Sequence, residues 1–298
     1  MESYPKKAQQ LVSQFYERAK LEPGQSIAFQ GAPGANSHIA TLACFPDAIA
    51  YPCFSFEDAL DAVITGQAGH AVIPIENSSA GRVADMHFLL PESGLYITGE
   101  YFKRIHHYLL AIPGSKVEDI KEVVSHPQAL AQCRHYLRKR GIKPIPNADT
   151  AAAAALVSER GDPHVAAISP DLAADLYQLE IIARKVEDIP HNTTRFCILS
   201  RTPDTGHESG QELMTTLLFE VKSVPAALFK ALGCFATNGI NMTKLESYSR
   251  DGCFTVAEFL ADIEGSPQDE ACARALEELQ FLSRSIRILG TYPKNRPK

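Results

Sequence analysis

The sequence has no uninterrupted run of about 20 apolar residues, the length that a membrane-spanning helix needs. Its first residues, from Met1 to Lys7, also lack the apolar core of a secretory signal. Basic residues nowhere form a long tract, and 29 of them against 35 acidic residues give a formal net charge of −6. We therefore expect a cytoplasmic protein that has neither a membrane nor a nucleic acid as its partner.

Recognisable cofactor and metal motifs are also missing. The seven cysteines are odd in number and widely spread, without a CxxC pair, and the histidines show no HxxxH spacing. The glycines at 31 and 34 fit neither the dinucleotide fingerprint GxGxxG nor the phosphate-loop signature GK[ST]. We expect a reduced protein without a structural disulfide, metal ion or cofactor. The absence of a GxSxG elbow argues against a hydrolase of that type.

What the sequence does contain is the ordinary balance of a globular protein, with 45% apolar and 21% charged residues. Its 298 residues leave room for about two domains. Residues 1–25 predict an N-terminal helical arm. From residue 26, apolar strand patterns alternate with helical ones, which is typical of an α/β layer. The expected strands are 26–29, 71–75, 123–124, 165–168 and 181–186, and the expected helices are 38–45, one that starts after Ser55, 127–140 and one that includes 151–155.

A polar segment with proline and glycine, residues 201–212, predicts a linker. The pattern after it has the order βαββαβ, which is the ferredoxin-like unit. The expected strands are 213–221, 242–249, 254–262 and 285–289, the helices are 225–237 and 267–283, and a turn falls at 250–252.

Four segments of the α/β region place small polar residues where we expect helices to start: 31–38, 76–81, 125–128 and 149–150. The free N–H groups and the dipole at a helix start attract anions, so several such ends in one cleft would hold a small polycarboxylate. The alternative is that these residues are merely good N-caps. A fifth segment, residues 192–196, brings hydroxyls beside an arginine at a strand end, where they could bind or protonate an anionic substrate.

In their order along the chain, these segments resemble the prephenate dehydratase family over about residues 26–200. The matching motifs are Gly31, Gly34, Ser37 and His38 in the opening turn, Pro-Ile-Glu-Asn-Ser at 74–78, Ser-His-Pro-Gln-Ala-Leu at 125–130 and Thr-Arg-Phe at 194–196. The tail at 213–293 resembles the ACT regulatory domain of the same family. Its motifs are Ala-Leu-Phe at 227–229, Asn-Gly-Ile-Asn at 238–241, Glu-Ser at 246–247 and Gly-Thr-Tyr-Pro at 290–293.

Three motifs depart from the family pattern. The opening turn usually carries Thr and Phe where this chain has Ala35 and Asn36. The effector loops usually contain Gly-Ala-Leu and Glu-Ser-Arg-Pro, whereas this chain has Ala-Ala-Leu at 226–228 and Glu-Ser-Tyr-Ser at 246–249. The catalytic motifs are intact, so the departures bear more on the effector than on catalysis.

The resemblance implies a two-lobed catalytic domain of the periplasmic-binding-protein type over residues 26–200. We expect one lobe at about 26–103 with 186–200, the other at about 104–185, and a ferredoxin-like ACT domain at 213–293. Because 25 residues are too few for a mutase-like helical domain ahead of it, we expect the monofunctional bacterial form.

The activity implied by the resemblance is that of a lyase in phenylalanine biosynthesis, which converts prephenate to phenylpyruvate, carbon dioxide and water. Thr194 is the expected donor to the leaving hydroxyl. The expected substrate-binding residues are Ser37, Glu76, Asn77, Ser78, His126, Gln128, Thr150, Arg195 and Phe196. The alternative for Arg195 and Phe196 is that they order the end of the strand. Phenylalanine is the expected effector in a homodimer or homotetramer, bound by Ala226, Ala227, Leu228, Asn241, Met242, Glu246 and Ser247.

Alternatives remain open from the sequence. The chain could act on arogenate, the transaminated substrate, instead of prephenate or beside it. It could also be a non-catalytic amino-acid sensor with the same two kinds of domain, which the intact Thr194 motif disfavours. A solute-binding protein is disfavoured by the missing secretory signal.

Overall fold

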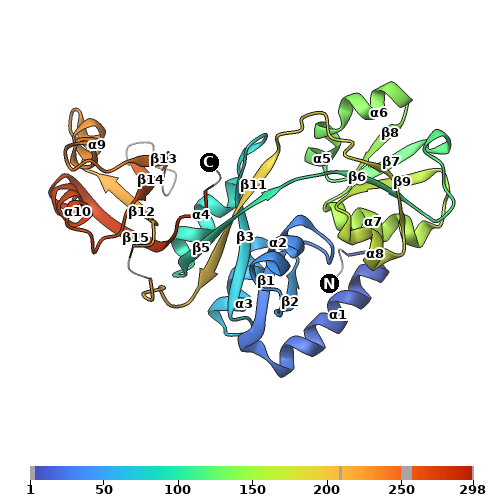
Figure 1. Ribbon diagram of the computed structural model, residues 1–298, viewed down its shortest axis with the longest axis horizontal. Helices are drawn as coiled ribbons and strands as arrows, with labels where there is room; N and C mark the ends of the chain where they lie inside the picture. The colour runs from blue at the N-terminus through green and yellow to red at the C-terminus, as the bar shows by residue number, and fades with distance from the viewer. Residues whose placement is uncertain (1–3, 208–209, 250–256, 297–298) are drawn as a thin grey trace. The chain divides into compact units, whose positions relative to one another are not determined.

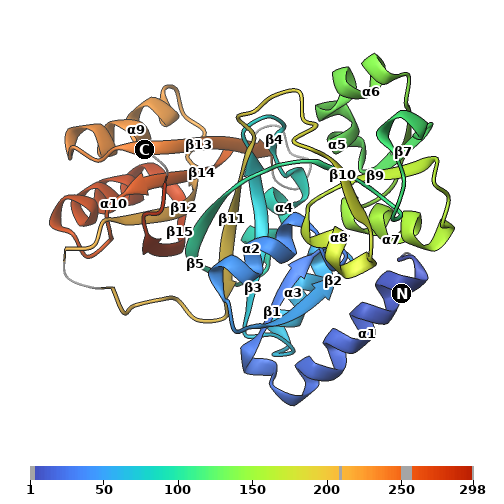
Figure 2. The ribbon, with the colours of Figure 1, turned by 45° about the vertical axis from the view of Figure 1, so that its right-hand side comes forward.

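The computed structural model describes residues 4–207, 210–249 and 257–296 (Figures 1 and 2). The chain divides into two compact units, residues 1–89 with 101–197, and residues 90–100 with 198–298. Strands β5 (Tyr96–Arg104) and β11 (Thr193–Ser200) each contribute residues to both units. Among the described helices, none is both long enough and apolar enough to cross a bilayer.

The first unit begins with helix α1 (Lys6–Leu21), which matches the predicted N-terminal arm. A sheet in the order β2-β1-β3-β11-β5, with β4 paired to β3, organises the first lobe, and β1 runs parallel to β2 and β3. Helix α3 starts after Ser55 as predicted, because Ser55 and Asp58 exchange side-chain and backbone hydrogen bonds. The remaining elements of this lobe are β1 (Ser26–Gln30), α2 (Asn36–Cys44), β2 (Ile49–Cys53), α3 (Phe56–Ile64), β3 (His70–Asn77), β4 (Gly81–Arg82) and α4 (Ala84–Glu92).

A second sheet, in the order β10-β6-β9-β7-β8, forms the second lobe of the same unit. Strand β7 is parallel to β8 and β9, whereas β6 is antiparallel to β9 and β10. The elements are β6 (Tyr108–Ala111), β7 (Glu122–Ser125), α5 (Pro127–Gln132), α6 (Arg134–Arg140), β8 (Lys143–Pro146), α7 (Thr150–Arg160), β9 (Val165–Ser169), α8 (Leu172–Tyr177) and β10 (Glu180–Arg184).

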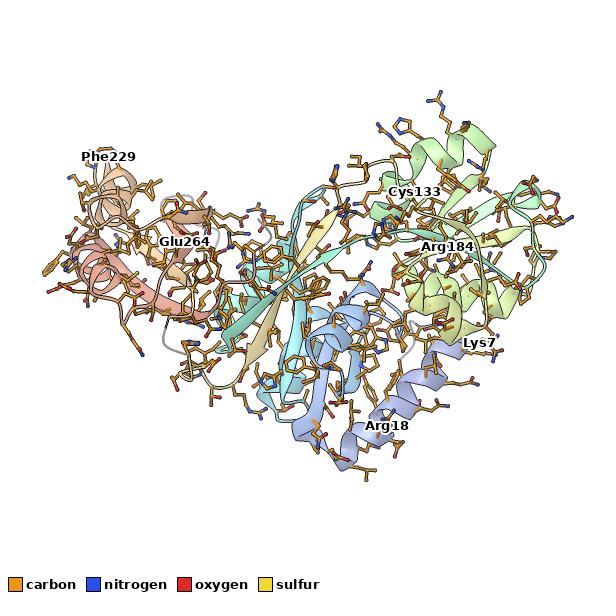
Figure 3. The ribbon with its side chains drawn as sticks, in the orientation of Figure 1. Lys7, Arg18, Cys133, Arg184, Phe229 and Glu264 are labelled. Carbon is orange, nitrogen blue, oxygen red and sulfur yellow. The ribbon has the colours of Figure 1, made fainter. Side chains whose placement is uncertain are left out.

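The prediction of one helix over residues 127–140 is wrong, because the chain breaks at Cys133 into α5 and α6 (Figure 3). Asp188, far along the chain, causes the break. Its backbone N–H donates to Gln132 O at 2.7 Å. Its carboxylate accepts from the N–H groups of His135 and Tyr136 at 3.1 and 3.4 Å, as a cap for α6. The predicted end of the helix at Gly141 is confirmed, with φ of 67°.

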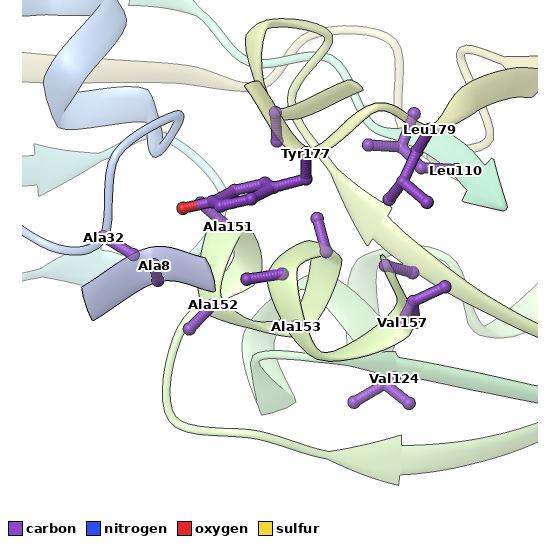
Figure 4. Close-up of a cluster of buried hydrophobic side chains, with 14 of the residues drawn as sticks. Ala8, Ala32, Leu110, Val124, Ala151, Ala152, Ala153, Val157, Tyr177 and Leu179 are labelled. Carbon is purple, nitrogen blue, oxygen red and sulfur yellow. The ribbon is translucent and has the colours of Figure 1, made fainter. Parts of the chain in front are cut away.

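The two lobes share a core built on small side chains around α7. Its five alanines, 151–155, are all buried and let neighbouring backbones approach closely. Figure 4 shows Ala8 of α1, Ala32 of the first lobe and Tyr177 of α8 gathered near the start of α7. Tyr177 Oη also donates to Pro33 O at 2.8 Å. These contacts fix the glycine-rich turn at 31–34 against the second lobe.

The second unit contains the predicted βαββαβ order. Its elements are β12 (Leu213–Val221), α9 (Ala227–Thr237), β13 (Met242–Ser249), β14 (Ala257–Glu264), α10 (Glu270–Leu282) and β15 (Ser283–Pro293). The sheet is antiparallel, in the order β13-β14-β12-β15, and its apolar face packs against α9 and α10 through a core that includes Phe219, Phe235 and Leu279. The predicted turn at 250–252 and the first residues of the predicted strand, 254–256, lie outside the described residues.

Strand β15 extends beyond the predicted 285–289, since it pairs along the whole of β12, from Val221 to Leu213. Within this unit β15 also passes close to β5. A Cβ built on Gly290 would lie 2.0 Å from Ile97 O, so only glycine fits there. The Gly-Thr-Tyr-Pro motif therefore marks a close backbone approach.

Candidate functional site

A cavity of about 340 Å³ lies in the first unit and is lined from both lobes. It brings together seven of the predicted site residues: Ser37, Asn77, His126, Gln128, Thr150, Thr194 and Phe196. They come from the start of α2, the end of β3, the starts of α5 and α7, and β11. Segments distant in the sequence thus meet at one polar cavity, as predicted.

Thr194 is buried, and its hydroxyl is held by the side chain of Asn77. Asn77 Nδ2 donates to Thr194 Oγ1 at 2.9 Å and to Asn192 Oδ1 at 2.7 Å. Both protons of the amide are therefore used. Because Thr194 Oγ1 accepts from Asn77, its own proton can be donated to a group in the cavity.

The carbonyl end of the same amide shapes the chain that follows it. Asn77 Oδ1 accepts from the backbone N–H groups of Ser79 and Ala80, at 3.0 and 2.9 Å. Residues 78–80 therefore form the turn between β3 and β4, and the prediction of a helix start in the segment 76–81 is wrong. The helix α4 begins later, at Ala84.

The other three segments do begin helices. Helix α2 begins at Asn36, and its Ser37 side chain lines the cavity. His126 is the N-cap of α5, with Nδ1 accepting from the N–H of Gln128 at 3.3 Å. Asp149 is the N-cap of α7, with Oδ1 accepting from the N–H of Ala152 at 2.7 Å. The starts of α2 and α7 each bring a positive dipole end toward the cavity.

Asp149 also lines the cavity itself, which sequence reasoning missed because an aspartate before a helix predicts only a cap. Burial raises the pKa of its carboxyl to about 6, although N–H groups of the backbone at Ala152, Ala151 and Ala32 act in the other direction. Burial also lowers the pKa of His126, so this imidazole is neutral at pH 7.

Five further lining residues lie outside the segments and motifs of the sequence analysis: Gln30, Phe56, Arg82, Val83 and Ala148. Phe56 fits a helical apolar face, and Gln30 ends a strand, so neither carries a signal for a site. Arg82 follows Gly81 in β4 and lies opposite Glu76 across the β3–β4 pair. Its only sequence signal is a position soon after the Pro-Ile-Glu-Asn-Ser motif.

The remaining predicted substrate-binding residues, Glu76, Ser78 and Arg195, are not among the described residues that line the cavity. The Ser78 hydroxyl joins β3 to β11, since it accepts from Thr193 N at 2.9 Å and donates to His191 O at 3.3 Å. Arg195 is buried within β11. Phe196, next to it, is buried and lines the cavity.

His38 of the opening motif supports the turn rather than the cavity. Its ring stacks on Phe29 with centroids 4.9 Å apart, and its Nδ1 accepts from Gly34 N at 3.0 Å. Burial lowers the pKa of His38 to about 4, so the ring is neutral at pH 7.

In the second unit, a separate cavity of about 520 Å³ is lined by residues 221–229 and Phe259. It contains three of the predicted effector residues, Ala226, Ala227 and Leu228. Ala226 has φ of 59°, in the left-handed region that favours glycine. The others, Asn241, Met242, Glu246 and Ser247, lie on or beside the edge strand β13 and are not among the described lining residues of this cavity.

The fold defines a two-lobed α/β protein with a polar cavity lined from both lobes, followed by a ferredoxin-like unit. The family model for prephenate dehydratase matches residues 27–204. The chain belongs to the prephenate dehydratase family and is an enzyme of the lyase class.

Relatives with this name match over nearly the whole chain. A bifunctional N-acyl-homoserine lactone acylase/prephenate dehydratase of Komagataeibacter europaeus is 49% identical, over 90% of this chain and 95% of its own length. Arogenate dehydratase/prephenate dehydratase 1 of Arabidopsis thaliana is 41% identical, over 90% of this chain and 71% of its own length. The solved prephenate dehydratase of Arthrobacter aurescens, in complex with L-Phe, is 31% identical with a TM-score of 0.83, over 92% of each chain.

Proposed function

We propose that this chain converts prephenate to phenylpyruvate, carbon dioxide and water. The observation that carries the proposal is the Thr194 hydroxyl, which Asn77 holds in a polar cavity with its proton available. Membership of the family supports the same reaction.

In this reaction the bond between the ring and its carboxylate breaks, and carbon dioxide leaves. The electron pair moves through the ring and breaks the bond to the hydroxyl on the opposite carbon. That oxygen takes up one proton and leaves as water, and the ring becomes aromatic. Thr194 Oγ1 donates a hydrogen bond to the departing oxygen, and positioned acid assistance of this kind contributes about 10²–10⁴-fold in rate.

The substrate is a dianion, and the cavity supplies donors for it. The side chains of Ser37 and Gln128 and the start of α7 at Thr150 line the cavity together with Thr194. Backbone N–H groups at a helix start are suited to carboxylates. We propose that these groups orient the ring so that its hydroxyl lies against Thr194.

The test is the formation of phenylpyruvate from prephenate, followed by its absorbance, with the full chain and two variants. Thr194→Val keeps the shape of the side chain and removes the hydroxyl, so kcat should fall about 10²–10⁴-fold. Thr194→Ser keeps the hydroxyl and should retain most of the rate. A wild-type chain that forms no phenylpyruvate would refute the activity, and a Thr194→Val chain that turns over normally would remove Thr194 from the mechanism.

A second candidate substrate is arogenate, because a relative at 41% identity carries both names. The same assay with arogenate yields phenylalanine, so the two values of kcat/KM decide between prephenate, arogenate and both. If the chain binds these compounds but converts neither, it is a sensor.

The acylase activity named for the Komagataeibacter relative finds less support in this site. A hydroxyl that attacks an amide needs a base within hydrogen-bond distance. Thr194 Oγ1 instead accepts from the amide of Asn77, which is no base. We therefore propose the dehydratase reaction for this cavity.

We further propose that phenylalanine regulates the enzyme through the second unit. The cavity includes Ala226–Leu228 at the start of α9, and the positive dipole end of a helix start favours an amino-acid carboxylate. The solved relative in complex with L-Phe supports the choice of ligand. Titration of the dehydratase rate with phenylalanine tests this, and a coupling of 1–3 kcal/mol, typical of allosteric enzymes, corresponds to about 5- to 150-fold in affinity. An unchanged rate at saturating phenylalanine would exclude regulation.

A homodimer or homotetramer is the proposed assembly. Large apolar side chains are exposed on the second unit: Phe229, shown on α9 in Figure 3, is 79% exposed, and Phe281 on α10 is 73% exposed. Such side chains, when they gather on a surface, mark contacts with other proteins. Sedimentation should show a dimer or tetramer for the wild-type chain and a smaller species for Phe229→Asp.

A further inference from the structure

The cavity in the first unit has fewer positively charged side chains than the proposed substrate has carboxylates. Prephenate carries two carboxylates, one on the ring and one on the side chain. Among the described residues that line the cavity, Arg82 is the only arginine or lysine. His126 is neutral at pH 7 because burial lowers its pKa, and Asp149 adds a carboxyl group. One guanidinium is therefore available for two carboxylates.

The position of Arg82 depends on the residue that holds Thr194. Strand β4 pairs with the end of β3, with Gly81 opposite Asn77 and Arg82 opposite Glu76. Asn77 Oδ1 closes the turn between the two strands through the N–H groups of Ser79 and Ala80. The amide end of Asn77 holds Thr194 Oγ1 at 2.9 Å. One side chain thus fixes both the hydroxyl and the short strand that carries the guanidinium.

Arg82 is exposed and, within the described part of the chain, its guanidinium makes no hydrogen bond or ion pair. An arginine presents a planar fork of donors that matches a carboxylate. Because Arg82 is exposed and is one of the residues that line the cavity, this fork is available to a ligand that binds there.

The chemistry decides which carboxylate it should bind. A cation on the ring carboxylate would stabilise the charge that must be lost as carbon dioxide, and so would deepen the ground state relative to the transition state. A cation on the side-chain carboxylate binds ground state and transition state alike, because this group is unchanged in the product. Placing the single guanidinium on the side-chain carboxylate gives affinity without slowing decarboxylation.

We infer that Arg82 binds the side-chain carboxylate of the substrate, the one that the reaction keeps. This inference rests on the proposed function for the identity of the substrate. It assigns Arg82 to binding, with Thr194 at the departing hydroxyl at the opposite end of the molecule.

Phenylpyruvate is the probe that separates the two carboxylates, since it keeps the side-chain carboxylate and lacks the ring carboxylate. We expect Arg82→Gln to weaken phenylpyruvate binding, measured by calorimetry, about 10- to 100-fold, the value of a hydrogen bond to a charged group. The KM for prephenate should rise by a similar factor, with a much smaller change in kcat. Arg82→Lys keeps the charge and loses the fork, so its affinity for phenylpyruvate should lie between that of the wild-type chain and that of Arg82→Gln.

Arg160→Gln is the matched control, because Arg160 is an exposed arginine at the end of α7 that does not line the cavity. It should leave the binding of phenylpyruvate unchanged. Because Arg82 is exposed, its substitution should also leave the melting temperature unchanged, which separates lost binding from lost structure.

Phenylpyruvate binding that Arg82→Gln leaves intact would overturn the inference, whether or not prephenate binding falls. A fall for prephenate alone would place Arg82 on the ring carboxylate. If the wild-type chain binds phenylpyruvate but does not convert prephenate, the proposed function fails, while the ratio of the two dissociation constants still decides the role of Arg82.

Discussion

Asn77→Asp is the substitution that most sharply tests the proposed role of Thr194. The carboxylate has nearly the shape of the amide and can still accept from the N–H groups of Ser79 and Ala80. It cannot donate to Thr194 Oγ1 or to Asn192 Oδ1. We expect the Thr194 hydroxyl to turn and donate to the new carboxylate, which withdraws its proton from the departing oxygen.

The expected magnitudes separate folding from catalysis. The hydrogen bond with Thr194 is kept in the reverse direction, and only the one to Asn192 Oδ1 is lost. Leaving that partly buried acceptor without its donor should lower the free energy of unfolding by about 1–3 kcal/mol. That loss leaves the chain folded if its stability is in the usual range of about 5–15 kcal/mol. The loss in kcat should be about 10²–10⁴-fold, the whole contribution of positioned acid assistance. Urea unfolding and the phenylpyruvate assay measure the two quantities on the same protein.

The pH dependence of the rate of Asn77→Asp is a further test of the role of Asn77 as the donor to Thr194. As the pH falls and the new carboxyl takes up a proton, it can donate to Thr194 again, so the relative rate of Asn77→Asp should recover toward low pH. Asn147→Asp is the control, because Asn147 Oδ1 only accepts, from Asp149 N at 3.3 Å, and a carboxylate can replace it there. A variant rate at position 77 that stays within about twofold of wild type, the range of neutral substitutions, would refute the reasoning.

Two predictions concern backbone geometry in the second unit. Ala226→Gly should raise the free energy of unfolding by about 0.5–1 kcal/mol, because alanine at φ of 59° carries a steric cost that glycine avoids. The greater entropy of glycine in the unfolded chain offsets part of this gain. A lower urea midpoint for the variant would contradict the prediction. Gly290→Ala should lower that free energy by about 1–3 kcal/mol or more, because the added Cβ would meet Ile97 O at 2.0 Å. Gly233→Ala in α9 is the control for Gly290→Ala, because a Cβ at position 233 meets nothing within 4 Å. This substitution should stabilise the helix by about 1 kcal/mol. Equal changes in the free energy of unfolding at positions 290 and 233 would show that the close approach to Ile97 does not destabilise an alanine at position 290.

The elements that were predicted correctly have local causes. The start of α3 follows from Ser55 and Asp58, three residues apart, and the end of α6 follows from Gly141. In the second unit, β12 and β13 have the predicted bounds because apolar patterns and turn residues mark both ends. The boundaries of the lobes, the linker and the ACT domain remain predictions.

The two wrong predictions have distant causes. The break at Cys133 depends on Asp188, and the turn at 78–80 depends on an amide that Thr194 and Asn192 hold in place. A pattern within one segment carries no information about either partner. The same limit explains why Arg82 was missed, since only pairing of β4 with β3 brings it to the cavity.

The candidate site was predicted well where polar residues stand at the ends of elements, and less well where one residue could serve two purposes. Asp149 is a helix cap and a cavity wall at once, and the sequence indicates only the cap. The reverse holds for Ser78. Its motif predicts a substrate-binding residue, whereas its hydroxyl makes hydrogen bonds that join β3 to β11. Both ambiguities arise because caps, turns and binding sites use the same short polar side chains.

The cavity has neutral donors, which suit the proposed reaction because a positive charge near the ring carboxylate would slow it. Thr194 is held by an amide, and His126 beside the cavity is neutral at pH 7, so neither would stabilise the ring carboxylate as an ion. Buried Arg195, next to Thr194 in the chain, is not among the described residues that line the cavity. A decarboxylation driven by a departing hydroxyl requires a donor at the oxygen and a weakly held carboxylate at the other end of the ring. A hydroxyl fixed by the Asn77 amide, with the guanidinium of Arg82 assigned to the carboxylate that the proposed reaction keeps, meets both requirements.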